Sequence, residues 1–530
     1  MMRLKNNFVK SYVLPNKKII FYILILFSIY CAVTIGFSWD EGFLINQGKI
    51  TANYLLSLGF SDPENYFRRE FYSPIYYSLR YFFVQAFPLK FHLEVGHLVN
   101  LFFSITAIVG IKKICEEFFN KDVGIIVFLI LFFYPAFFGH MGFNSKDTII
   151  AFCHVWIFYL AIKYLKSHKN YYIYYLSLLA AVGTGMNLFF LGSLLPLIIL
   201  FLLEIFYYKK FNSKEIKIQK FLIDFFKGFL IFYFFLVLFW IDTHPNIFIL
   251  PFKFLYEWAF SDLWRGYHYI LVNGNYYLYA DIPKNYLFTN LVYRSPEYFL
   301  VTYIIFFGLF INYKSYFTKR FRFFNYKLSW IFSMIVYTFV LLYITPFSIY
   351  DGLRHVLWML PYLCIAPALT IYFLIKNFKK TIVKFTSSIL LIFTVFFVFN
   401  FLSITPYQYT YLNILNGSKK NNIKKFENDY WGASVKELVN KIDFDKNKKM
   451  KISTCGVSHE MPKYYLKKRK FTNFEISGYE NSDYIIITNR ATMNLKNKKL
   501  LNCFDKHDGE EMFNVSRNGV ILSSFRKTNK

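Results

Sequence analysis

The feature that most limits how this chain can fold is the recurrence of long apolar stretches without charged residues. A helix of about 20 apolar residues crosses the hydrocarbon core of a bilayer. The run from Tyr171 to Tyr208 is too long for one crossing, and we predict a turn at Gly183-Thr184-Gly185 within it. We therefore expect a mainly α-helical membrane protein with about eleven spans, over 19–37, 94–112, 122–140, 148–164, 171–187, 188–207, 221–240, 296–312, 328–346, 355–375 and 385–403.

The charge of the chain supports this interpretation. Lys and Arg number 61 against 32 Asp and Glu, which gives a formal charge of +29. The basic residues gather in every second loop, so they all fall on one side of the membrane, and cytoplasmic loops of membrane proteins are enriched in Lys and Arg. The pattern places the N-terminus in the cytoplasm and the segment after the last span on the opposite side. The membrane topology thus explains the excess of positive charge, and no nucleic-acid partner is expected.

The chain divides into a membrane block, 1–403, and a tail outside the membrane, 404–530. Within the block, the outer loops 38–93 and 241–295 are long. The tail has a short helical pattern and then three strand-like runs, which predict a small α/β domain. The runs are Lys451–Thr454, Tyr484–Thr488 and Val520–Phe525.

Two of the six cysteines, Cys455 and Cys503, fall in the tail. They can pair if the tail lies in an oxidising compartment, and the sequence leaves open whether they do. No Cys and His spacing resembles a zinc site.

An acidic pair follows the first apolar stretch directly, in Ser38-Trp39-Asp40-Glu41-Gly42. Placing carboxylates beside lipid is energetically unfavourable, so such residues usually have a function. The simpler alternative is that Asp40 caps a helix or is solvated at the interface. Three further polar clusters fall at the same side of the membrane: Gly139-His140 with Asn144-Ser145-Lys146-Asp147, the loop from Gly274 to Tyr286 with Asp281, and Tyr350-Asp351-Gly352-Leu353-Arg354-His355.

Together these clusters contain the groups that a transfer reaction needs. A carboxylate can act as a general base towards a hydroxyl, and fixed cations stabilise a departing phosphate. Arg offers a planar fork to phosphate, and Lys offers a point charge. Each cluster also has a simpler explanation: Lys146 and Asp147 as a loop ion pair, Arg354 as a contact to lipid headgroups, and His355 as an interfacial residue. Their convergence on one face favours catalysis.

The motifs resemble those of the GT-C glycosyltransferases in the protein O-mannosyltransferase superfamily, which includes the aminoarabinose transferases of lipid A. Trp39-Asp40-Glu41-Gly42 resembles the acidic motif of the first loop, whose Asp is the proposed base. Phe138-Gly139-His140 with Asn144-Ser145-Lys146-Asp147 is similar to the Gly-His and Asn-Pro-Lys-Asp signature of a bacterial branch related to glycosyltransferase family 39, with Ser145 in place of Pro.

Two more segments extend this resemblance over nearly the whole chain. Tyr350-Asp351-Gly352-Leu353-Arg354-His355 is similar to a Gly-x-Arg-His motif, and Asp429-Tyr430-Trp431-Gly432 to an Asp-Tyr-Trp-Gly segment. There are also two departures. Where aminoarabinose transferases have Lys-Pro-Pro this chain has Tyr72-Ser73-Pro74, and where many relatives have an Arg it has Gly185-Met186-Asn187-Leu188. The loss of a phosphate-binding Lys gives Arg354 and Lys146 more weight.

The resemblance implies an inverting glycosyltransferase in a bacterial inner membrane. It would move a hexose or pentose from a polyprenyl-phosphate donor to a hydroxyl of a lipid, glycan or protein on the periplasmic face. No obligate cofactor is implied, and a divalent metal is an alternative that we do not favour. The implied catalytic residues are Asp40, Glu41 and Asp147, the donor phosphate would meet Lys146, Arg354 and His355, and further substrate contacts are expected from His140, Asn144, Asp281, Tyr286 and Asp351, with Trp264 as a candidate for stacking on a sugar.

Two other classes of many-spanning protein are alternatives. A transporter of lipid-linked sugars would favour charges at mid-membrane and inverted repeats, whereas these charges gather at one face. A polysaccharide polymerase or ligase would rely on Arg and His loops without an acidic pair after the first span. Asp40 and Glu41 therefore favour the transferase, while the sugar, the acceptor and the oligomeric state stay open.

Overall fold

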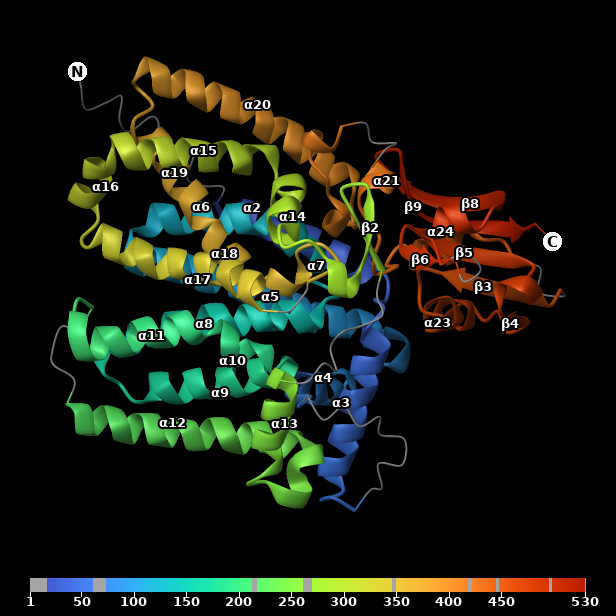
Figure 1. Ribbon diagram of the computed structural model, residues 1–530, viewed down its shortest axis with the longest axis horizontal. Coiled ribbons are helices and arrows are strands. Elements are labelled where there is room, and N and C mark those ends of the chain that lie inside the picture. The colour runs from blue at the N-terminus through green and yellow to red at the C-terminus, as the bar shows by residue number, and fades with distance from the viewer. Residues whose placement is uncertain are drawn as a thin grey trace.

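The computed structural model describes residues 17–60, 73–211, 217–260, 269–345, 349–417, 422–444, 448–494 and 498–529. Long helices lie side by side in a bundle, and a smaller β-rich domain sits at one end of it (Figure 1). We call this end of the bundle the domain end. It is where α2 (Lys17–Thr34) finishes and where α5 (His92–Phe118) and α8 (Ser145–Ser167) begin. The expected fold class, mainly helical with a small mixed C-terminal domain, is confirmed.

Every apolar stretch that was expected to span contains a helix, but not every helix is long enough to cross alone. Five in the described ranges meet both length and hydropathy criteria: α5, α8, α12 (Ile218–Phe239), α17 (Phe324–Ile344) and α20 (Thr381–Ser403). A sixth is added if α14 (Tyr286–Arg294) and α15 (Glu297–Asn312), bent by 112°, form one broken span. The remaining stretches hold shorter helices: α2, α6 (Lys121–Phe132), α7 (Pro135–His140), α9 (Tyr171–Met186), α10 (Phe189–Ser193), α11 (Leu195–Leu203), α18 (Leu360–Leu363) and α19 (Ile365–Lys376).

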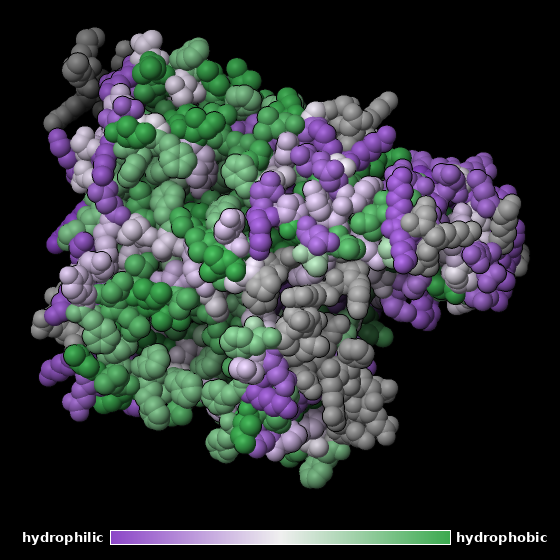
Figure 2. All heavy atoms as spheres, viewed as in Figure 1, coloured by the Kyte–Doolittle hydropathy of each residue, from purple (hydrophilic) through white to green (hydrophobic). Residues whose placement is uncertain are grey.

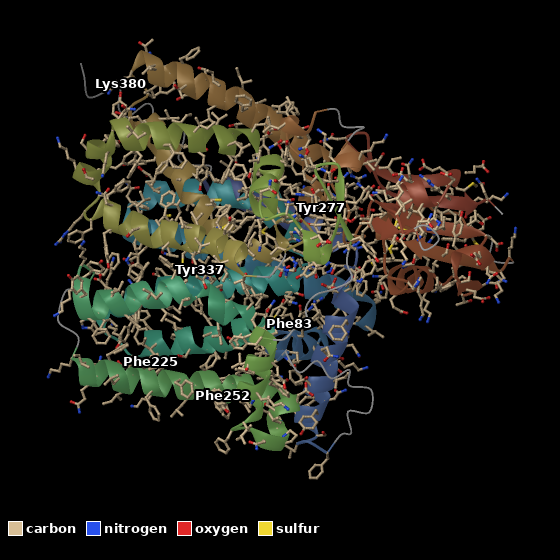
Figure 3. The ribbon with its side chains drawn as sticks, viewed as in Figure 1. Phe83, Phe225, Phe252, Tyr277, Tyr337 and Lys380 are labelled. Atoms are coloured by element: carbon tan, nitrogen blue, oxygen red, sulfur yellow. A yellow bond between two sulfur atoms is a disulfide. The ribbon has the colours of Figure 1, made fainter. Side chains whose placement is uncertain are left out.

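The surface of the bundle is that of a membrane protein. Figure 2 shows apolar side chains over the helices, and polar ones over the C-terminal domain and at the opposite end. Phe225 on α12 and Phe252 on α13 (Leu250–Phe260) are among the exposed aromatic residues, whereas Lys380 lies at the end far from the domain (Figure 3). An apolar belt between two polar ends is what a helical bundle in a bilayer requires.

The turn predicted at Gly183-Thr184-Gly185 is wrong. Helix α9 runs through these residues, and the chain turns at Asn187. The two glycines are instead places of close packing. A Cβ on Gly183 would lie 2.4 Å from the Phe190 ring, and one on Gly185 would lie 2.4 Å from the carbonyl oxygen of Ser73.

The two long outer loops contain elements of their own. The first holds α3 (Glu41–Leu56) and α4 (Ile75–Val84). The second holds α13, the antiparallel hairpin of β1 (Tyr269–Val272) and β2 (Asn275–Leu278), and then α14. A short helix, α16 (Lys314–Arg320), links α15 to α17 at the far end of the bundle.

The C-terminal domain is built on a five-stranded sheet in the order β4-β3-β5-β9-β8. Strand β3 is parallel to β4 and β5, and β9 is antiparallel to β5 and β8. Only three of these five strands were predicted. The two that were missed are β4, which is only three residues long, and β8, which is a largely exposed edge strand with charged residues. The elements are α21 (Asn422–Lys425), α22 (Val435–Lys441), β3 (Met450–Cys455), α23 (Glu460–Lys468), β4 (Phe474–Ile476), β5 (Tyr484–Thr488), β6 (Ala491–Met493), β7 (Leu500–Asn502), α24 (Cys503–Lys506), β8 (Gly509–Arg517) and β9 (Val520–Thr528).

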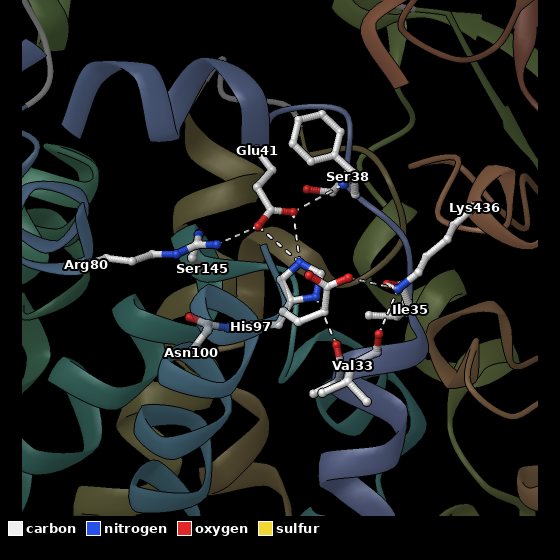
Figure 4. Close-up of polar contacts among 12 residues, drawn as sticks. Val33, Ile35, Ser38, Glu41, Arg80, His97, Asn100, Ser145 and Lys436 are labelled. Atoms are coloured by element: carbon white, nitrogen blue, oxygen red, sulfur yellow. Dashed lines mark hydrogen bonds and ion pairs between the residues drawn. The ribbon is translucent and has the colours of Figure 1, made fainter. Parts of the chain in front are cut away.

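The domain is tied within itself and to the bundle. A disulfide joins Cys455 to Cys503, the pairing that the sequence left open. Lys436 on α22 donates to the carbonyl oxygens of Val33 at 2.7 Å and Ile35 at 3.3 Å, just where α2 ends (Figure 4). The domain is thereby fixed beside the start of the first outer loop.

Candidate active site

The acidic pair lies at the beginning of α3. Asp40 is the residue before the helix and Glu41 is its first residue. Successive residues of an α-helix point about 100° apart. The two neighbouring carboxylates therefore face different surroundings: the Asp40 side chain is 42% exposed and the Glu41 side chain is 1% exposed.

Glu41 belongs to a closed cluster of buried charges (Figure 4). Its Oε1 lies 2.9 Å from Nη2 of Arg80, and both of its oxygens lie 3.1 Å from Nε2 of His97. The backbone N–H of Ser38 donates to Oε2 at 3.3 Å, and the other His97 nitrogen faces the carbonyl of Ala32 at 2.9 Å. Burial alone would raise the pKa of Glu41, but His97 and Arg80 outweigh it and hold this pKa at about 2. We call these three side chains the Glu41 cluster.

Asp40 faces a second cluster, centred on Arg354. The Arg354 side chain is 5% exposed and begins a short 3-10 turn, Arg354–Val356. Its Nε lies 3.2 Å from Asp351 Oδ2, and its Nη1 lies 3.4 Å from Asp40 Oδ2 and 3.8 Å from Asp147 Oδ2. Charge-assisted hydrogen bonds are usually about 2.7–2.9 Å long, so none of these contacts is tight. We call these four side chains the Arg354 cluster.

Two other predicted residues hold Asp147 in place. Asn144 caps α8: its side-chain oxygen accepts from the Asp147 N–H at 3.1 Å, and its Nδ2 donates to Asp147 Oδ2 at 2.9 Å. A polar residue at this position satisfies the free N–H groups of the first helical turn. The same Nδ2 lies 3.3 Å from Nδ1 of His140, whose Nε2 lies 2.9 Å from the hydroxyl of Tyr430. His140 and Asn144 therefore connect Asp147 to the C-terminal part of the chain.

The loop that carries Arg354 is shaped by Gly352 and Tyr286. Gly352 has a φ of +69°, a conformation that residues with a Cβ rarely adopt. Its N–H donates to the hydroxyl of the buried Tyr286 at 2.8 Å. Tyr286, expected to contact substrate, thus supports the loop in this structure, while Asp281 lies exposed on a separate 3-10 turn.

The predicted phosphate contacts lie around Tyr350. The guanidinium of Arg354 is 4.8 Å from the centre of the Tyr350 ring, and the His355 ring centre is 4.7 Å from it. Burial is the main reason why the pKa of Tyr350 rises to about 12, and the charges of Arg354 and Lys146 act against that rise. Lys146 and His355 are therefore near the Arg354 cluster. Trp264, the candidate for sugar stacking, lies outside the described residues.

The C-terminal part supplies residues that the sequence analysis did not assign to the site. Nε1 of Trp431 donates to Asp351 Oδ2 at 3.2 Å, and Nη2 of Arg490 lies 3.4 Å from Asp351 Oδ1. Nearby, Glu427 is buried and accepts from the N–H of Ala491 at 2.7 Å. Burial raises the pKa of Glu427 to about 7. Only Trp431 stood in a quoted motif, and no local pattern marks Arg490 or Glu427.

The acidic side chains of the site face a guanidinium. Within the ranges that the structure describes, no three His, Cys, Asp or Glu side chains are grouped as ligands for a metal ion. Asp40, Asp147 and Asp351 instead surround Arg354. This arrangement offers a half-exposed carboxylate next to a buried, fixed cation.

Comparison with solved structures finds the same fold over almost the whole chain. ArnT from Cupriavidus metallidurans in the apo state matches with a TM-score of 0.50 and 10% identity, over 96% of this chain and 97% of that one. The same protein bound to undecaprenyl phosphate matches with a TM-score of 0.51 and 9% identity, over 96% and 98%. No protein-family model and no curated protein sequence matches this chain. The chain therefore has the fold of ArnT, the GT-C fold that its sequence motifs implied.

Proposed function

We propose that this protein is a GT-C glycosyltransferase that moves a sugar from a polyprenyl-phosphate donor to a hydroxyl acceptor. The observation that carries the proposal is the pairing of half-exposed Asp40 with buried Arg354 at the domain end of the bundle. A base that the acceptor can reach and a cation for the leaving phosphate are the two groups that such a transfer needs. The likeness to an ArnT structure that contains undecaprenyl phosphate supports a lipid-linked donor.

In the proposed reaction, Asp40 takes the proton of the acceptor hydroxyl while that oxygen forms a bond to the anomeric carbon. The bond from this carbon to the phosphate oxygen breaks on the opposite side, so the configuration is inverted. The electron pair leaves with the polyprenyl phosphate, whose growing negative charge Arg354 stabilises. Because the contact between Arg354 and Asp40 is long, 3.4 Å, phosphate oxygens can take it over and leave Asp40 available as the base.

The other predicted residues have supporting roles in this proposal. Asp351 and Asp147 orient the Arg354 guanidinium, and both are almost fully buried. Lys146 and His355 lie where they can add contacts to the donor phosphate. Glu41 stabilises the fold at the start of α3 through its ion pair with Arg80.

We also propose that the domain end faces the periplasm of a bacterial inner membrane and that the N-terminus is cytoplasmic. The disulfide between Cys455 and Cys503 supports this orientation, because disulfides persist in oxidising compartments. The Lys-rich loops at the opposite end of the bundle, where Lys380 lies, support it as well (Figure 3).

The proposal is tested with the purified full chain and a panel of synthetic polyprenyl-phosphate sugars. We expect the wild type to release polyprenyl phosphate from at least one donor. Asp40→Asn should bind polyprenyl phosphate normally but turn over about 10²–10⁴-fold more slowly. The matched control is Glu475→Gln, a change of an exposed carboxylate that pairs with Lys449 at 2.8 Å in the C-terminal domain. A wild type that neither binds polyprenyl phosphate nor consumes any donor would overturn the proposal.

A further inference from the structure

Arg490 connects the C-terminal domain to both sides of the Arg354 cluster. It follows strand β5 and is 11% exposed, so its charge is largely removed from water. Its contacts reach two separate parts of the chain that carry the proposed catalytic groups. One is Asp351, on the loop of Arg354, and the other is Trp39, the residue directly before Asp40.

The first contact makes Asp351 a bridge between two guanidinium groups. Its Oδ1 lies 3.4 Å from Nη2 of Arg490, and its Oδ2 lies 3.2 Å from Nε of Arg354. A carboxylate that is shared in this way neutralises each cation only in part. Without Arg490, Asp351 would still accept from Trp431, but its charge would act on Arg354 alone, and Arg354 would then have less charge to offer to a phosphate.

The second contact holds the residue next to the proposed base. The Arg490 guanidinium lies 5.2 Å from the centre of the Trp39 ring, within the range of a cation–π interaction. Trp39 is 39% exposed, so much of its ring has no packing from the protein. Arg490 also donates to the carbonyl oxygen of Tyr430, which fixes the guanidinium in place. Arg490 therefore holds the side chain of the residue directly before Asp40.

We propose that Arg490 is a positioning residue for the sugar transfer. It shares Asp351 with Arg354, and it holds Trp39 so that Asp40 stays beside the Arg354 guanidinium. This inference rests on the proposed function and extends it, because it makes the C-terminal domain a part of the active site. Arg490 acts through Asp351 and Trp39 and does not itself touch the reacting atoms.

Arg517, in the same domain, is the matched comparison for a purely structural role. Arg517 donates to the carbonyl oxygen of Thr405 at 2.9 Å, pairs with Glu437 at 2.5 Å and lies 5.1 Å from the centre of the Tyr407 ring. It thus also ties the domain to the end of the bundle. Its contacts do not include a member of the Arg354 cluster, so a change at Arg517 reports on domain attachment alone.

The test compares Arg490→Gln, Arg490→Lys and Arg517→Gln by kcat, donor KM and melting temperature in the full chain. A displacement of reacting groups by about 1 Å can lower a rate about 100-fold, so we expect kcat of Arg490→Gln to fall between 10- and 100-fold. Its melting temperature should fall no more than that of Arg517→Gln. Arg490→Lys should recover part of the rate, because it restores the charge but not the planar fork. Arg517→Gln should keep the wild-type kcat per folded molecule.

Two outcomes would overturn the inference. One is a wild-type kcat in Arg490→Gln, and the other is a loss of rate that follows the unfolded fraction equally in Arg490→Gln and Arg517→Gln. Assays of the wild-type protein distinguish a failure of this inference from a failure of the proposed function. If the wild type consumes donor, the variants alone decide on Arg490. If it consumes no donor and binds no polyprenyl phosphate, the proposed function fails and this inference fails with it.

Discussion

Asp40 and Glu41 are neighbours in the sequence but belong to two very different charge clusters. In the Glu41 cluster, a 1% exposed carboxylate meets Arg80 at 2.9 Å and His97 at 3.1 Å. In the Arg354 cluster, the 42% exposed Asp40 meets its cation at 3.4 Å. In the Glu41 cluster the charges are neutralised by close partners within the protein. In the Arg354 cluster the cation is paired less closely and can still interact with an anionic ligand.

The difference follows from what burial does to ions. A buried charge is tolerated only with close partners that replace water, and the Glu41 cluster meets that requirement. Arg354 is also buried, but its carboxylate partners lie at 3.2, 3.4 and 3.8 Å. An anion with several oxygens, such as a phosphate, can approach such a guanidinium more closely. We infer that Glu41 stabilises the fold and that Asp40 and Arg354 act on substrate.

The largest expected effect comes from breaking the Glu41 cluster. Glu41→Ala leaves Arg80 and His97 buried without their carboxylate, and removing one partner of a buried ion pair costs about 3–5 kcal/mol of unfolding free energy. Denaturant or thermal unfolding in detergent measures this loss. The control is Glu460→Ala, which breaks an exposed pair with Lys463 at 3.0 Å and should cost less than about 1 kcal/mol. Equal losses in the two variants would contradict the distinction between the clusters.

The second prediction breaks the Arg354 cluster. Arg354→Ala should lower the rate of polyprenyl-phosphate release by about 10²–10³-fold, because the charge that develops on the phosphate loses its fixed cation. Arg354→Lys should lie between this variant and the wild type, since it keeps a charge but not the fork. Arg320→Ala, at the far end of the bundle on α16, is the matched control with an expected wild-type rate. An unchanged rate in Arg354→Ala would show that the cluster does not meet the donor.

The third prediction uses pH to compare Glu427, which lies beside the Arg354 cluster, with Glu41. Burial raises the pKa of Glu427, which lies near Asp351 and Arg490, from 4.5 to about 7. Between pH 4.5 and pH 7, Glu427 keeps its proton in the folded protein but has lost it in the unfolded chain. The unfolding free energy should therefore fall as pH rises from 4.5 to 7, by on the order of 3 kcal/mol. Glu427→Gln should remove this dependence in melting curves recorded from pH 4.5 to 8, and a variant with the wild-type slope would refute the assignment.

Glu41 should show the opposite dependence. Its partners hold its pKa at about 2, below the ordinary 4.5, so its contribution to stability is complete above pH 4.5. That contribution should be lost as pH falls from 4.5 towards 2. The difference in melting temperature between wild type and Glu41→Gln should therefore be constant above pH 4.5 and shrink as pH falls from 4.5 towards 2. Curves that stay parallel over this range would contradict the ion pairing of Glu41.

The smallest expected effect concerns the support of the Arg354 loop. Tyr286→Phe removes the hydroxyl that accepts from the Gly352 N–H, and an unpaired buried N–H costs about 1–3 kcal/mol. We expect a lower melting temperature and a rate reduced a few-fold. Tyr277→Phe, on the half-buried strand β2, is the matched control and should change stability by less than about 0.5 kcal/mol. A rate reduced 100-fold in Tyr286→Phe would instead indicate a direct contact with substrate.

Much of the fold could be predicted from the sequence because the bilayer imposes a length on apolar stretches. The errors arose where a residue type has more than one use. Gly183 and Gly185 suggested a turn, yet in α9 they allow close approach of Phe190 and Ser73. The exposed edge strand β8 has too many polar residues to read as a strand.

The site was predictable only where a local motif marks it. Asp40, Asp147, Asp351 and Arg354 stood in such motifs, although 314 residues separate Asp40 from Arg354. Arg80 was missed, but it carries a signal: a lone charge in an apolar, aromatic stretch needs a partner. Arg490 has no such signal, because its importance lies in contacts to Trp39 and Asp351 that only the folded chain creates.

The most direct test of the account measures single-turnover sugar transfer and melting temperature together for Asp40→Asn and Glu41→Gln. The account predicts a rate about 10²–10⁴-fold lower in Asp40→Asn, with little change in its melting temperature. It predicts a clearly lower melting temperature in Glu41→Gln, with a rate per folded molecule within a few-fold of the wild type. Wild-type transfer by Asp40→Asn, or full stability with abolished transfer in Glu41→Gln, would contradict it.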